Sequence, residues 1–382
     1  MTSENNINSS DTSKVSPIGG DLEGAVAIEL LKKLIATPSY SKEEDKTASA
    51  IEQFLELKNV SSKRYLNNVW TGNKYFDNSK PTILLNSHHD TVRPNKGYTL
   101  DPFSPIEKEK KLFGLGSNDA GGALVSLIAV FLYFYEKENL KYNLILAATA
   151  EEEISGKNGV EALLVSKEFL KPLNVKHPFK GWGCIVGEPT QMQMAVAEKG
   201  LLVIDCIADG KAGHAAREEG ENAIYKAMND IEWFQSHQFP KISELLGPVK
   251  MSVTSIATDN KAHNITPSQC SFIADVRVNE LYTFEEVLKT ILENVQCKVQ
   301  PRSTRLRSTS IALDHPLVKA GLALGRTYYG SPTTSDKALM PFPTLKIGPG
   351  DSARSHIADE FIYLDEIKEG IEIYIRLLEQ IL

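Results

Sequence analysis

Residues 143–153 read NLILAATAEEE, an apolar run that ends in three consecutive acids. An unbroken apolar run of this length is typical of a strand that is buried on both faces of a parallel sheet. Similar runs occur at 81–85, 184–186 and 344–347, and helical patterns occur at 23–35, 43–57 and 121–135. Helices that alternate with such strands predict an α/β fold, with a mostly parallel sheet that helices cover on both faces.

A different pattern spans residues 200–301. Its expected order is strand, helix, strand, strand, helix, strand, which is the order of a ferredoxin-like unit. The strands are expected at 201–208, 251–257, 270–278 and 298–300, and the helices at 221–236 and 283–295. We therefore expect an α+β lid or dimerisation domain at 198–303, inserted into a metal-binding catalytic domain formed by 21–197 and 304–382. The polar residues 1–20 are expected to form a disordered tail.

The composition excludes several classes of partner. The 382 residues carry a formal net charge of −7 and no basic tract, so we expect no binding to nucleic acid or to an anionic membrane. The longest apolar run, at 123–135, is shorter than the ~18 residues that span a bilayer. The four cysteines form no CxxC pair, and the first twenty residues lack the apolar core of a secretory signal. A reducing, cytoplasmic location is therefore expected.

Ionisable side chains follow each of the four expected strands of the α/β domain. They are His88, His89 and Asp90 after the first strand, Glu151 to Glu153 after the second, Glu188 after the third and His356 in the loop after the fourth. Asp119 lies in a glycine-rich loop just before the apolar helix at 121–135. In open α/β sheets, ligands bind at the carboxyl ends of the strands, so these groups are expected to converge. Clustered carboxylates repel one another, and a cation is expected to hold them.

Imidazole and carboxylate groups in this number suit two divalent metal ions, zinc first, with cobalt, manganese or iron as alternatives. The candidate metal ligands are His88, Asp119, Glu153, Glu188 and His356. Asp90 can accept the second ring N–H of His88 and fix its tautomer, and this His-x-Asp spacing favours His88 over His89 as the ligand. Glu152 and Glu153 are adjacent and cannot easily share one role, so one can bind metal while the other accepts a proton from water.

An ordered set of short motifs accompanies these residues. The motifs are SHHDTV at 87–92, GLGSNDAGG at 114–122, TAEEEISGKNG at 149–159, VGEPT at 186–190, GKAGHA at 210–215, HNITP at 263–267, ADVR at 274–277 and GPGDSARSHIADE at 348–360. Together they resemble the dinuclear zinc deacylase and peptidase family that includes acetylornithine deacetylase, succinyl-diaminopimelate desuccinylase, aminoacylase and carboxypeptidase G. The resemblance extends from about residue 28 to the end of the chain. Ser87, Ser355 and Glu151 depart from the residues usual in the family, but none of them is a candidate ligand.

The resemblance implies a role for each matched residue. His88 and Glu188 would hold one metal ion, Glu153 and His356 would hold the other, and Asp119 would bridge them. The remaining implied roles are Asp90 as the residue that orients His88, Glu152 as the general base, His214 as a stabiliser of the oxyanion, and Arg277, Asn264 and the Gly350 loop as binders of the substrate carboxylate. In dimeric members of the family, the equivalent of His214 reaches into the active site of the neighbouring subunit.

The implied activity is the hydrolysis of a small-molecule N-acyl amino acid. As a whole, the chain looks most like acetylornithine deacetylases, which act in arginine biosynthesis. The alternative substrates are N-acetylcitrulline, N-succinyl-ornithine, N-succinyl-citrulline and N-succinyl-diaminopimelate. Dipeptides are a further alternative, for a dipeptidase or carboxypeptidase, and a non-catalytic binding protein on the same scaffold is a distant alternative.

The sequence contains neither a GxGxxG dinucleotide fingerprint nor the GxSxG elbow of a serine hydrolase. Unpaired sheet edges in the inserted domain lead us to expect a homodimer through that domain.

Overall fold

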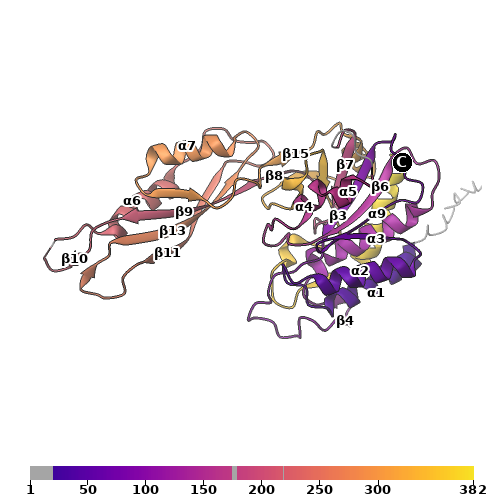
Figure 1. Ribbon diagram of the computed structural model, residues 1–382, viewed down its shortest axis with the longest axis horizontal. Helices are drawn as coiled ribbons and strands as arrows, with labels where there is room; N and C mark the ends of the chain where they lie inside the picture. The colour runs from indigo at the N-terminus through magenta and orange to yellow at the C-terminus, as the bar shows by residue number, and fades with distance from the viewer. Residues whose placement is uncertain (1–19, 174–178, 218) are drawn as a thin grey trace, which may run out of the picture.

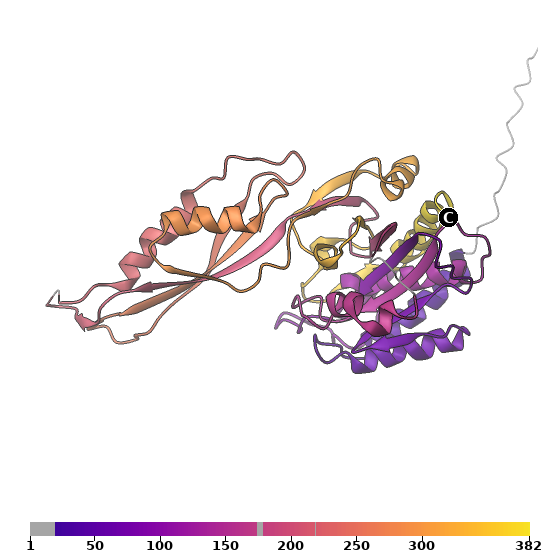
Figure 2. The ribbon, with the colours of Figure 1, turned by 45° about the horizontal axis from the view of Figure 1, so that its top comes forward.

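The computed structural model describes residues 20–173, 179–217 and 219–382. Two lobes lie end to end along the long axis of the molecule, and Figures 1 and 2 show them from two directions. The larger lobe contains both the beginning and the end of the described chain, and the smaller lobe is formed by its middle part. Apart from Gly20, the tail that the sequence predicts at 1–20 falls outside the described residues.

A nine-stranded sheet forms the centre of the larger lobe. Its order is β1 (Lys63–Tyr65), β2 (Asn68–Gly72), β6 (Asn143–Thr149), β3 (Thr82–His88), β7 (Trp182–Val186), β17 (Thr344–Lys346), β8 (Met194–Glu198) and β15 (Thr309–Ser310), with β16 (Tyr328–Ser331) also paired to β8. The four central strands, β6, β3, β7 and β17, run parallel to one another. Antiparallel pairs flank them on both sides. The predicted α/β fold is confirmed, because the four apolar runs form this parallel centre and every residue of these strands is buried.

Helices cover both faces of the central sheet. One face packs against α3 (Gly122–Tyr135), α1 (Gly20–Ile35) and α9 (Leu364–Glu379), with α2 (Asp45–Leu57) next to α1 and α8 (Pro316–Ala323) next to α9. The other face packs against the shorter helices α4 (Val160–Val165) and α5 (Lys167–Leu170). The segment that ends in α3, Ser117–Tyr135, is apolar enough to cross a membrane, but 83% of its apolar window is buried inside the protein. Its apolar residues on all sides therefore reflect a position in the core.

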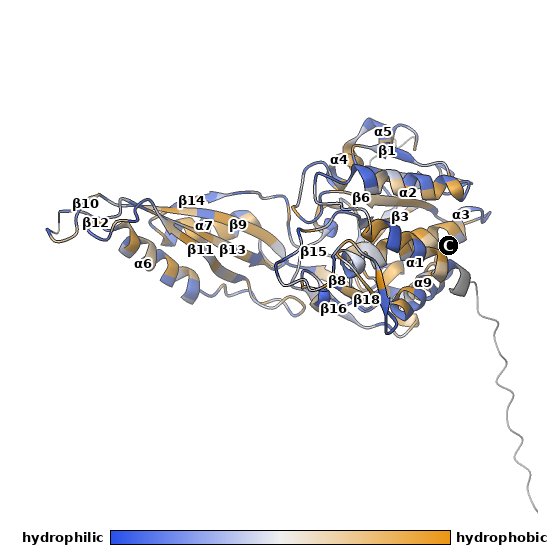
Figure 3. Cartoon of the chain, turned by 90° about the horizontal axis from the view of Figure 1, so that it is seen from below, coloured by the Kyte–Doolittle hydropathy of each residue, from blue (hydrophilic) through white to orange (hydrophobic). Residues whose placement is uncertain are grey.

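The smaller lobe contains a four-stranded antiparallel sheet with the order β11-β13-β9-β14. Its elements are β9 (Gly200–Asp209), α6 (Ala223–Ser236), β11 (Lys250–Thr258), β13 (Gln269–Val278), α7 (Phe284–Asn294) and β14 (Lys298–Pro301). This order and topology confirm the predicted ferredoxin-like inserted unit, whereas its exact limits at 198–303 stay a prediction. Buried and part-exposed residues alternate along β9, so one face of the sheet packs on the two helices. Figure 3 shows apolar residues gathered on these strands.

The ends of the two inserted helices have polar caps. Thr283 begins α7 with a capping box, in which its hydroxyl accepts the Glu286 N–H and the Glu286 carboxylate accepts the Thr283 N–H. Asn222, which lies within the helix predicted at 221–236, is instead the N-cap of α6 and accepts the Ile224 N–H. A short pair of strands, β10 (Gly213–His214) and β12 (Ile265–Thr266), lies at the end of the lobe farthest from the central sheet (Figure 1).

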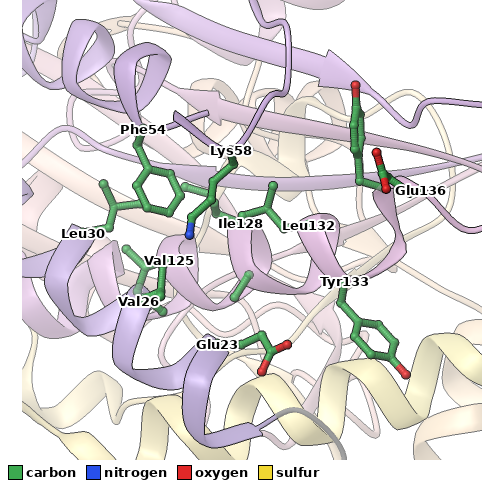
Figure 4. A pocket seen from close by; sticks show the side chains of 13 residues that line it. Glu23, Val26, Leu30, Phe54, Lys58, Val125, Ile128, Leu132, Tyr133 and Glu136 are labelled. Atoms are coloured by element: carbon green, nitrogen blue, oxygen red, sulfur yellow. The ribbon is translucent and has the colours of Figure 1, made fainter. Parts of the chain in front are cut away.

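Two further features complete the larger lobe. A three-stranded sheet is formed by β4 (Ile106–Lys108), β5 (Lys111–Phe113) and β18 (Phe361–Tyr363). A mainly apolar cavity of about 320 Å³ lies between α1, α2 and α3, with Glu23, Lys58 and Glu136 among its polar residues (Figure 4). None of the predicted site residues lines this cavity, so the chemistry is expected elsewhere.

Candidate active site

The predicted site residues of the larger lobe meet at one edge of the central sheet. His88 is the last residue of β3, Glu151 to Glu153 follow β6, and Glu188 follows β7. The loop after β17 leads to His356. Because these four strands are parallel, their carboxyl ends lie at the same edge. Asp119 joins them from the turn that precedes α3.

Two groups of potential metal ligands share one residue. His88, Asp119 and Glu188 form the first group, and Asp119, Glu153 and His356 form the second. Within each group, the donor atoms all lie within 4.8 Å of one another. Asp119 belongs to both groups, as a carboxylate that bridges two cations must.

The first group has the properties of a cation site. His88 Nε2 lies 3.4 Å from an oxygen of Asp119 and 3.9 Å from one of Glu188, yet it is buried without a hydrogen-bond partner among the described residues. A buried nitrogen in this condition costs free energy unless something binds its lone pair. Burial also raises the pKa of Glu188 to about 8, although His88 and Lys346 oppose this shift. The donor set of imidazole and carboxylate therefore fits a divalent metal ion.

The second group is more open to solvent. His356 Nε2 lies 3.0 Å from an oxygen of Glu153 and 3.5 Å from one of Asp119. The hydrogen bond with Glu153 raises the pKa of His356 to about 9. Its imidazole is about half exposed, at 54% of the side-chain surface, whereas the His88 side chain is 1% exposed. The site therefore has a closed half and a half that faces solvent.

Asp90 organises both the histidine and the acidic loop. Nδ1 of His88 lies 3.0 Å from the backbone carbonyl oxygen of Asp90 and 3.4 Å from its Oδ1. The two carboxylate oxygens of Asp90 accept the backbone N–H groups of Glu152 at 3.0 Å and Glu153 at 3.2 Å, and the Ser41 hydroxyl at 2.6 Å. Burial opposes the charge of Asp90, but the contacts with His88 and these donors lower its pKa below the usual value. Asp90 thus holds the ring of one ligand and the backbone of another.

Glu152 and Glu153 are separated by the structure. Glu153 lies in the second ligand group, whereas Glu152 lies outside both groups, with an oxygen 3.9 Å from His88 Nε2. Burial raises the pKa of Glu152 well above its usual value. A carboxyl group in this condition can accept a proton from a water molecule near neutral pH and release it again.

His89 faces away from the cluster. Its Nδ1 lies 2.9 Å from the Thr47 hydroxyl, and its Nε2 lies 2.9 Å from the Asn67 carbonyl oxygen. Burial lowers the pKa of His89 to about 4, so it is a neutral histidine between two polar partners. This placement agrees with the choice of His88 as the ligand.

Two cavities open onto the cluster. The first, of about 290 Å³, is lined by Asp119, Glu152, Glu153, Glu188, Pro189, Tyr329, Ser331, Pro332, Thr333, Thr334, Lys346, Ser352, Ser355 and His356. The second, of about 350 Å³, shares Glu152, Glu153 and His356 with it and adds Arg277 from β13 of the inserted unit. The Arg277 guanidinium makes two hydrogen bonds to Asp275, of 2.7 and 2.9 Å. Arg277 is therefore the predicted substrate-binding residue that the inserted unit brings to the cluster in the same chain.

His214 and Asn264 lie away from the cluster. They are found at the short β10–β12 pair, at the far end of the inserted unit, where the Ala215 N–H donates to the Asn264 carbonyl oxygen (Figure 1). Neither residue lines the two cavities beside the metal cluster. The chain by itself therefore does not bring these two predicted residues to the cluster.

Gly350 shapes the loop that leads to His356. Its φ is 91°, and a Cβ atom there would lie 2.6 Å from Oδ1 of Asn118 and 3.2 Å from Cβ of Pro189. Glycine is therefore required by both the backbone conformation and the close approach of the neighbouring loops. Direct contact between Gly350 and a substrate stays a prediction.

Sequence reasoning missed Glu360, which supports the bridging residue. Its carboxylate is buried and accepts the backbone N–H groups of Gly116 at 3.1 Å, Asn118 at 2.8 Å and Asp119 at 2.9 Å. The position of Glu360 at the end of the GPGDSARSHIADE motif was a signal of function, but the sequence could not indicate its partner. Glu360 fixes the turn that presents Asp119.

These features define the class of protein. Two ligand groups that share a carboxylate, with a further carboxyl group beside them, belong to a dinuclear metal-dependent hydrolase. The family model described as peptidase family M20/M25/M40 matches residues 84–380. The chain therefore belongs to this family, and it is a metal-dependent amidohydrolase.

Named relatives and solved structures agree with this assignment. The chain is 26% identical to succinyl-diaminopimelate desuccinylase of Wolbachia pipientis subsp. Culex pipiens (strain wPip), over 91% of each chain. It is also 26% identical to acetylornithine deacetylase of Proteus mirabilis (strain HI4320), over 92% of this chain and 96% of that protein. The M20 family metallo-carboxypeptidase Sso-CP2 of Sulfolobus solfataricus has the same fold, with a TM-score of 0.72 and 17% identity over 94% of this chain and 99% of the other.

Proposed function

We propose that the chain removes the acyl group from an N-acyl amino acid, with N-acetylornithine as the first candidate substrate, as a step of arginine biosynthesis in the cytoplasm. The observation that carries the proposal is the position of Glu152, which lies beside two ligand groups joined by Asp119 but belongs to neither. Zinc is the proposed metal, with cobalt or manganese as alternatives, because imidazole and carboxylate ligands suit all three.

The residues fit the roles that such a reaction requires. His88 and Glu188 would hold one metal ion, Glu153 and His356 the other, and Asp119 both. When bound, such a pair of ions activates a water molecule and polarises the acyl carbonyl group.

Glu152 then acts as a proton carrier. It accepts the proton of the attacking water and donates it to the nitrogen of the leaving amine, so that the amide bond breaks and a carboxylate and an amine are released. Asp90 keeps the loop of Glu152 in place through its two backbone hydrogen bonds. Arg277 is proposed to bind the α-carboxylate of the substrate, because a guanidinium presents paired donors to a carboxylate.

The inserted unit is proposed to act as a dimerisation domain as well as a lid. His214 and Asn264 would enter the active site of the partner subunit, where His214 would stabilise the oxyanion of the tetrahedral intermediate and Asn264 would bind the substrate carboxylate. The far placement of both residues in their own chain supports this arrangement. The start of β9 at Gly200 and the end of β14 at Pro301 support limits of the inserted domain near 198–303.

A second candidate substrate is N-succinyl-diaminopimelate. Several of the named relatives are succinyl-diaminopimelate desuccinylases, at a level of identity similar to that of the acetylornithine deacetylase. N-acetylcitrulline, N-succinyl-ornithine, N-succinyl-citrulline and dipeptides remain further alternatives.

A hydrolysis panel with the zinc-loaded protein tests the proposal. It should contain N-acetylornithine, N-acetylcitrulline, N-succinylornithine, N-succinylcitrulline, N-succinyl-diaminopimelate and a dipeptide, with the free amine as the measured product. We expect at least one N-acyl amino acid to be cleaved in preference to the dipeptide. Activity on the dipeptide alone would replace the proposal by a peptidase, and a metal-loaded protein without activity on the panel would favour a binding protein.

A further inference from the structure

A buried lysine lies at the sheet edge that carries the metal ligands. Lys346 is the last residue of β17, and it pairs in register with Val186 of β7, two residues before Glu188. Lys346 is only 4% exposed, but it lines the 290 Å³ cavity together with Glu152, Glu153 and His356. Among the described residues that line this cavity, it is the one lysine or arginine.

Polar partners on one side of Lys346 stabilise its positive charge. Its Nζ lies 2.8 Å from Oε1 of Glu198, which is fully buried and also accepts the Ser335 hydroxyl at 2.8 Å. Nζ also donates to the Thr333 hydroxyl at 3.2 Å. Although burial opposes the charge, Glu198 and Glu188 raise the pKa of Lys346 above its usual value. Lys346 is therefore a cation that is held in place.

One N–H donor of the Lys346 ammonium group is left without a partner among the described residues. An ammonium group has three N–H donors, and Glu198 and Thr333 account for two of them. Glu198 is fully buried, whereas Lys346 belongs to the cavity wall, so the ion pair presents its positive end to the cavity. Ser331, Thr333 and Thr334 add hydroxyl groups to the same wall. The four carboxylates of the same cavity, Asp119, Glu152, Glu153 and Glu188, are the proposed metal ligands and the proposed base, so with metal bound the side around Lys346 suits an anion and disfavours an ammonium group.

We propose that Lys346 is a specificity-determining residue that binds a second carboxylate of the substrate, one that the substrate carries in addition to its α-carboxylate. The inference rests on the proposed function as a deacylase of N-acyl amino acids, in which Arg277 binds the α-carboxylate from the other cavity, and it favours the N-succinyl candidates over N-acetylornithine, which has no second carboxylate. The second carboxylate can belong to a dicarboxylic acyl group or to an acidic side chain, and the same charge-assisted hydrogen bond would recognise either.

Two matched substrate pairs distinguish these sources. In the first pair, N-succinyl-L-ornithine is compared with N-acetyl-L-ornithine, and the extra carboxylate lies in the acyl group. In the second pair, N-acetyl-L-glutamate is compared with N-acetyl-L-glutamine, and the extra carboxylate lies in the side chain. For each pair, the ratio of kcat/KM between the acidic and the neutral substrate reports how strongly the extra carboxylate is recognised, whatever the absolute activity.

The decisive variant removes both charges of the pair. Lys346→Met alone leaves Glu198 buried without its counter-ion and can unfold the protein, so the test uses Lys346→Met combined with Glu198→Gln. We expect the acidic-to-neutral ratio of one pair to fall about 10- to 100-fold in this double variant, as for the loss of a hydrogen bond between charged groups. Lys319→Met, which removes an exposed lysine of α8, should leave the ratio unchanged.

A purely structural ion pair would give another result. In that case, the double variant would keep the wild-type ratio for both pairs, and the proposal would be overturned. Thermal unfolding of each variant verifies that the ratio is measured on folded protein.

A binding measurement separates this proposal from the proposed function. Calorimetric titration of the zinc-loaded protein with succinate, and with monomethyl succinate as a probe with one charge fewer, should show a preference for succinate that falls about 10- to 100-fold in the double variant. An equal preference in both proteins would overturn the role of Lys346, even if the hydrolysis panel succeeds. If no substrate of the hydrolysis panel is cleaved but the preference for succinate still depends on Lys346, only the proposed function would be overturned.

Discussion

The metal cluster and the tip of the inserted unit make a contrast within one chain. The cluster residues come from segments far apart in sequence, yet the parallel sheet brings their donor atoms within 4.8 Å of one another. His214 and Asn264 come from motifs that are as recognisable, but they lie at an exposed β-pair at the opposite end of the molecule (Figure 1). Residues at the ends of core strands are thus placed by the fold of one chain. For residues at the tip, we propose that a place in the site is acquired through assembly.

The largest expected effect belongs to the cluster. Glu152→Gln removes the proposed proton acceptor and keeps the side-chain shape, so kcat should fall by about 10²–10⁴-fold or more. The metal content, measured by elemental analysis, should stay that of the wild type, because Glu152 lies outside both ligand groups. Activity near the wild-type level would show that another residue accepts the proton.

The next effect tests whether the tip acts across a dimer. His214→Ala should lower kcat by about 10²–10³-fold, the usual result of removing a donor to the oxyanion. Co-refolding of His214→Ala with Glu152→Gln should restore roughly a quarter of the wild-type activity, because half of the dimers are mixed and each has one intact site. If the mixture stays inactive, or if a monomer is fully active, the in-trans role is wrong.

The third prediction concerns Glu360, which holds the loop of the bridging residue Asp119. Glu360→Gln weakens the acceptor that holds three backbone N–H groups around Asp119, so zinc affinity should fall about 10- to 100-fold. Asp359→Asn is the matched control, because its carboxylate binds Thr99 at the surface. Equal zinc affinities of Glu360→Gln and the wild type, from competition with a chelator, would contradict this role.

Metal binding should also depend on pH. The hydrogen bond with Glu153 raises the pKa of His356 to about 9, so protons occupy the imidazole below that pH and compete with metal. Zinc affinity should therefore rise with pH up to about 9, by ~10-fold per pH unit for each proton released. Titrations at several pH values check this, and His356→Ala should give a shallower slope. A pH-independent affinity of the wild type between pH 7 and 9 would disagree with the assignment.

The smallest expected effect is confined to the inserted unit. Thr283→Ala removes the side-chain cap of α7 and should lower the free energy of unfolding by about 1 kcal/mol. Zinc affinity should not change, because α7 lies away from the cluster. Denaturant unfolding and zinc titration of the same variant measure both quantities, and a loss of zinc affinity would show that the two regions are coupled.

Sequence reasoning was strongest where chemistry and periodicity coincide. The apolar runs identified the central strands, and the ionisable residues after them identified both ligand groups. It was weaker where a residue acts through the backbone. Glu360 binds three N–H groups of a loop more than 240 positions earlier in the chain, and no local pattern predicts such a pairing. The antiparallel flanks of the central sheet were missed for the same reason, because strand order depends on long-range pairing.

The sequence alone determined the fold class, the inserted unit and the candidate ligands, because strand burial and ligand chemistry leave a local record in the order of residues. The residues alone left open which of Glu152 and Glu153 binds metal, although the family resemblance implied Glu153. The tertiary structure placed Glu153 in a ligand group and Glu152 outside, and it alone decided that His89 turns toward Thr47 and Asn67. It also placed Lys346 beside Glu198 at the cavity wall. These distinctions depend on distances between side chains from different segments, which packing sets and the order of residues does not show.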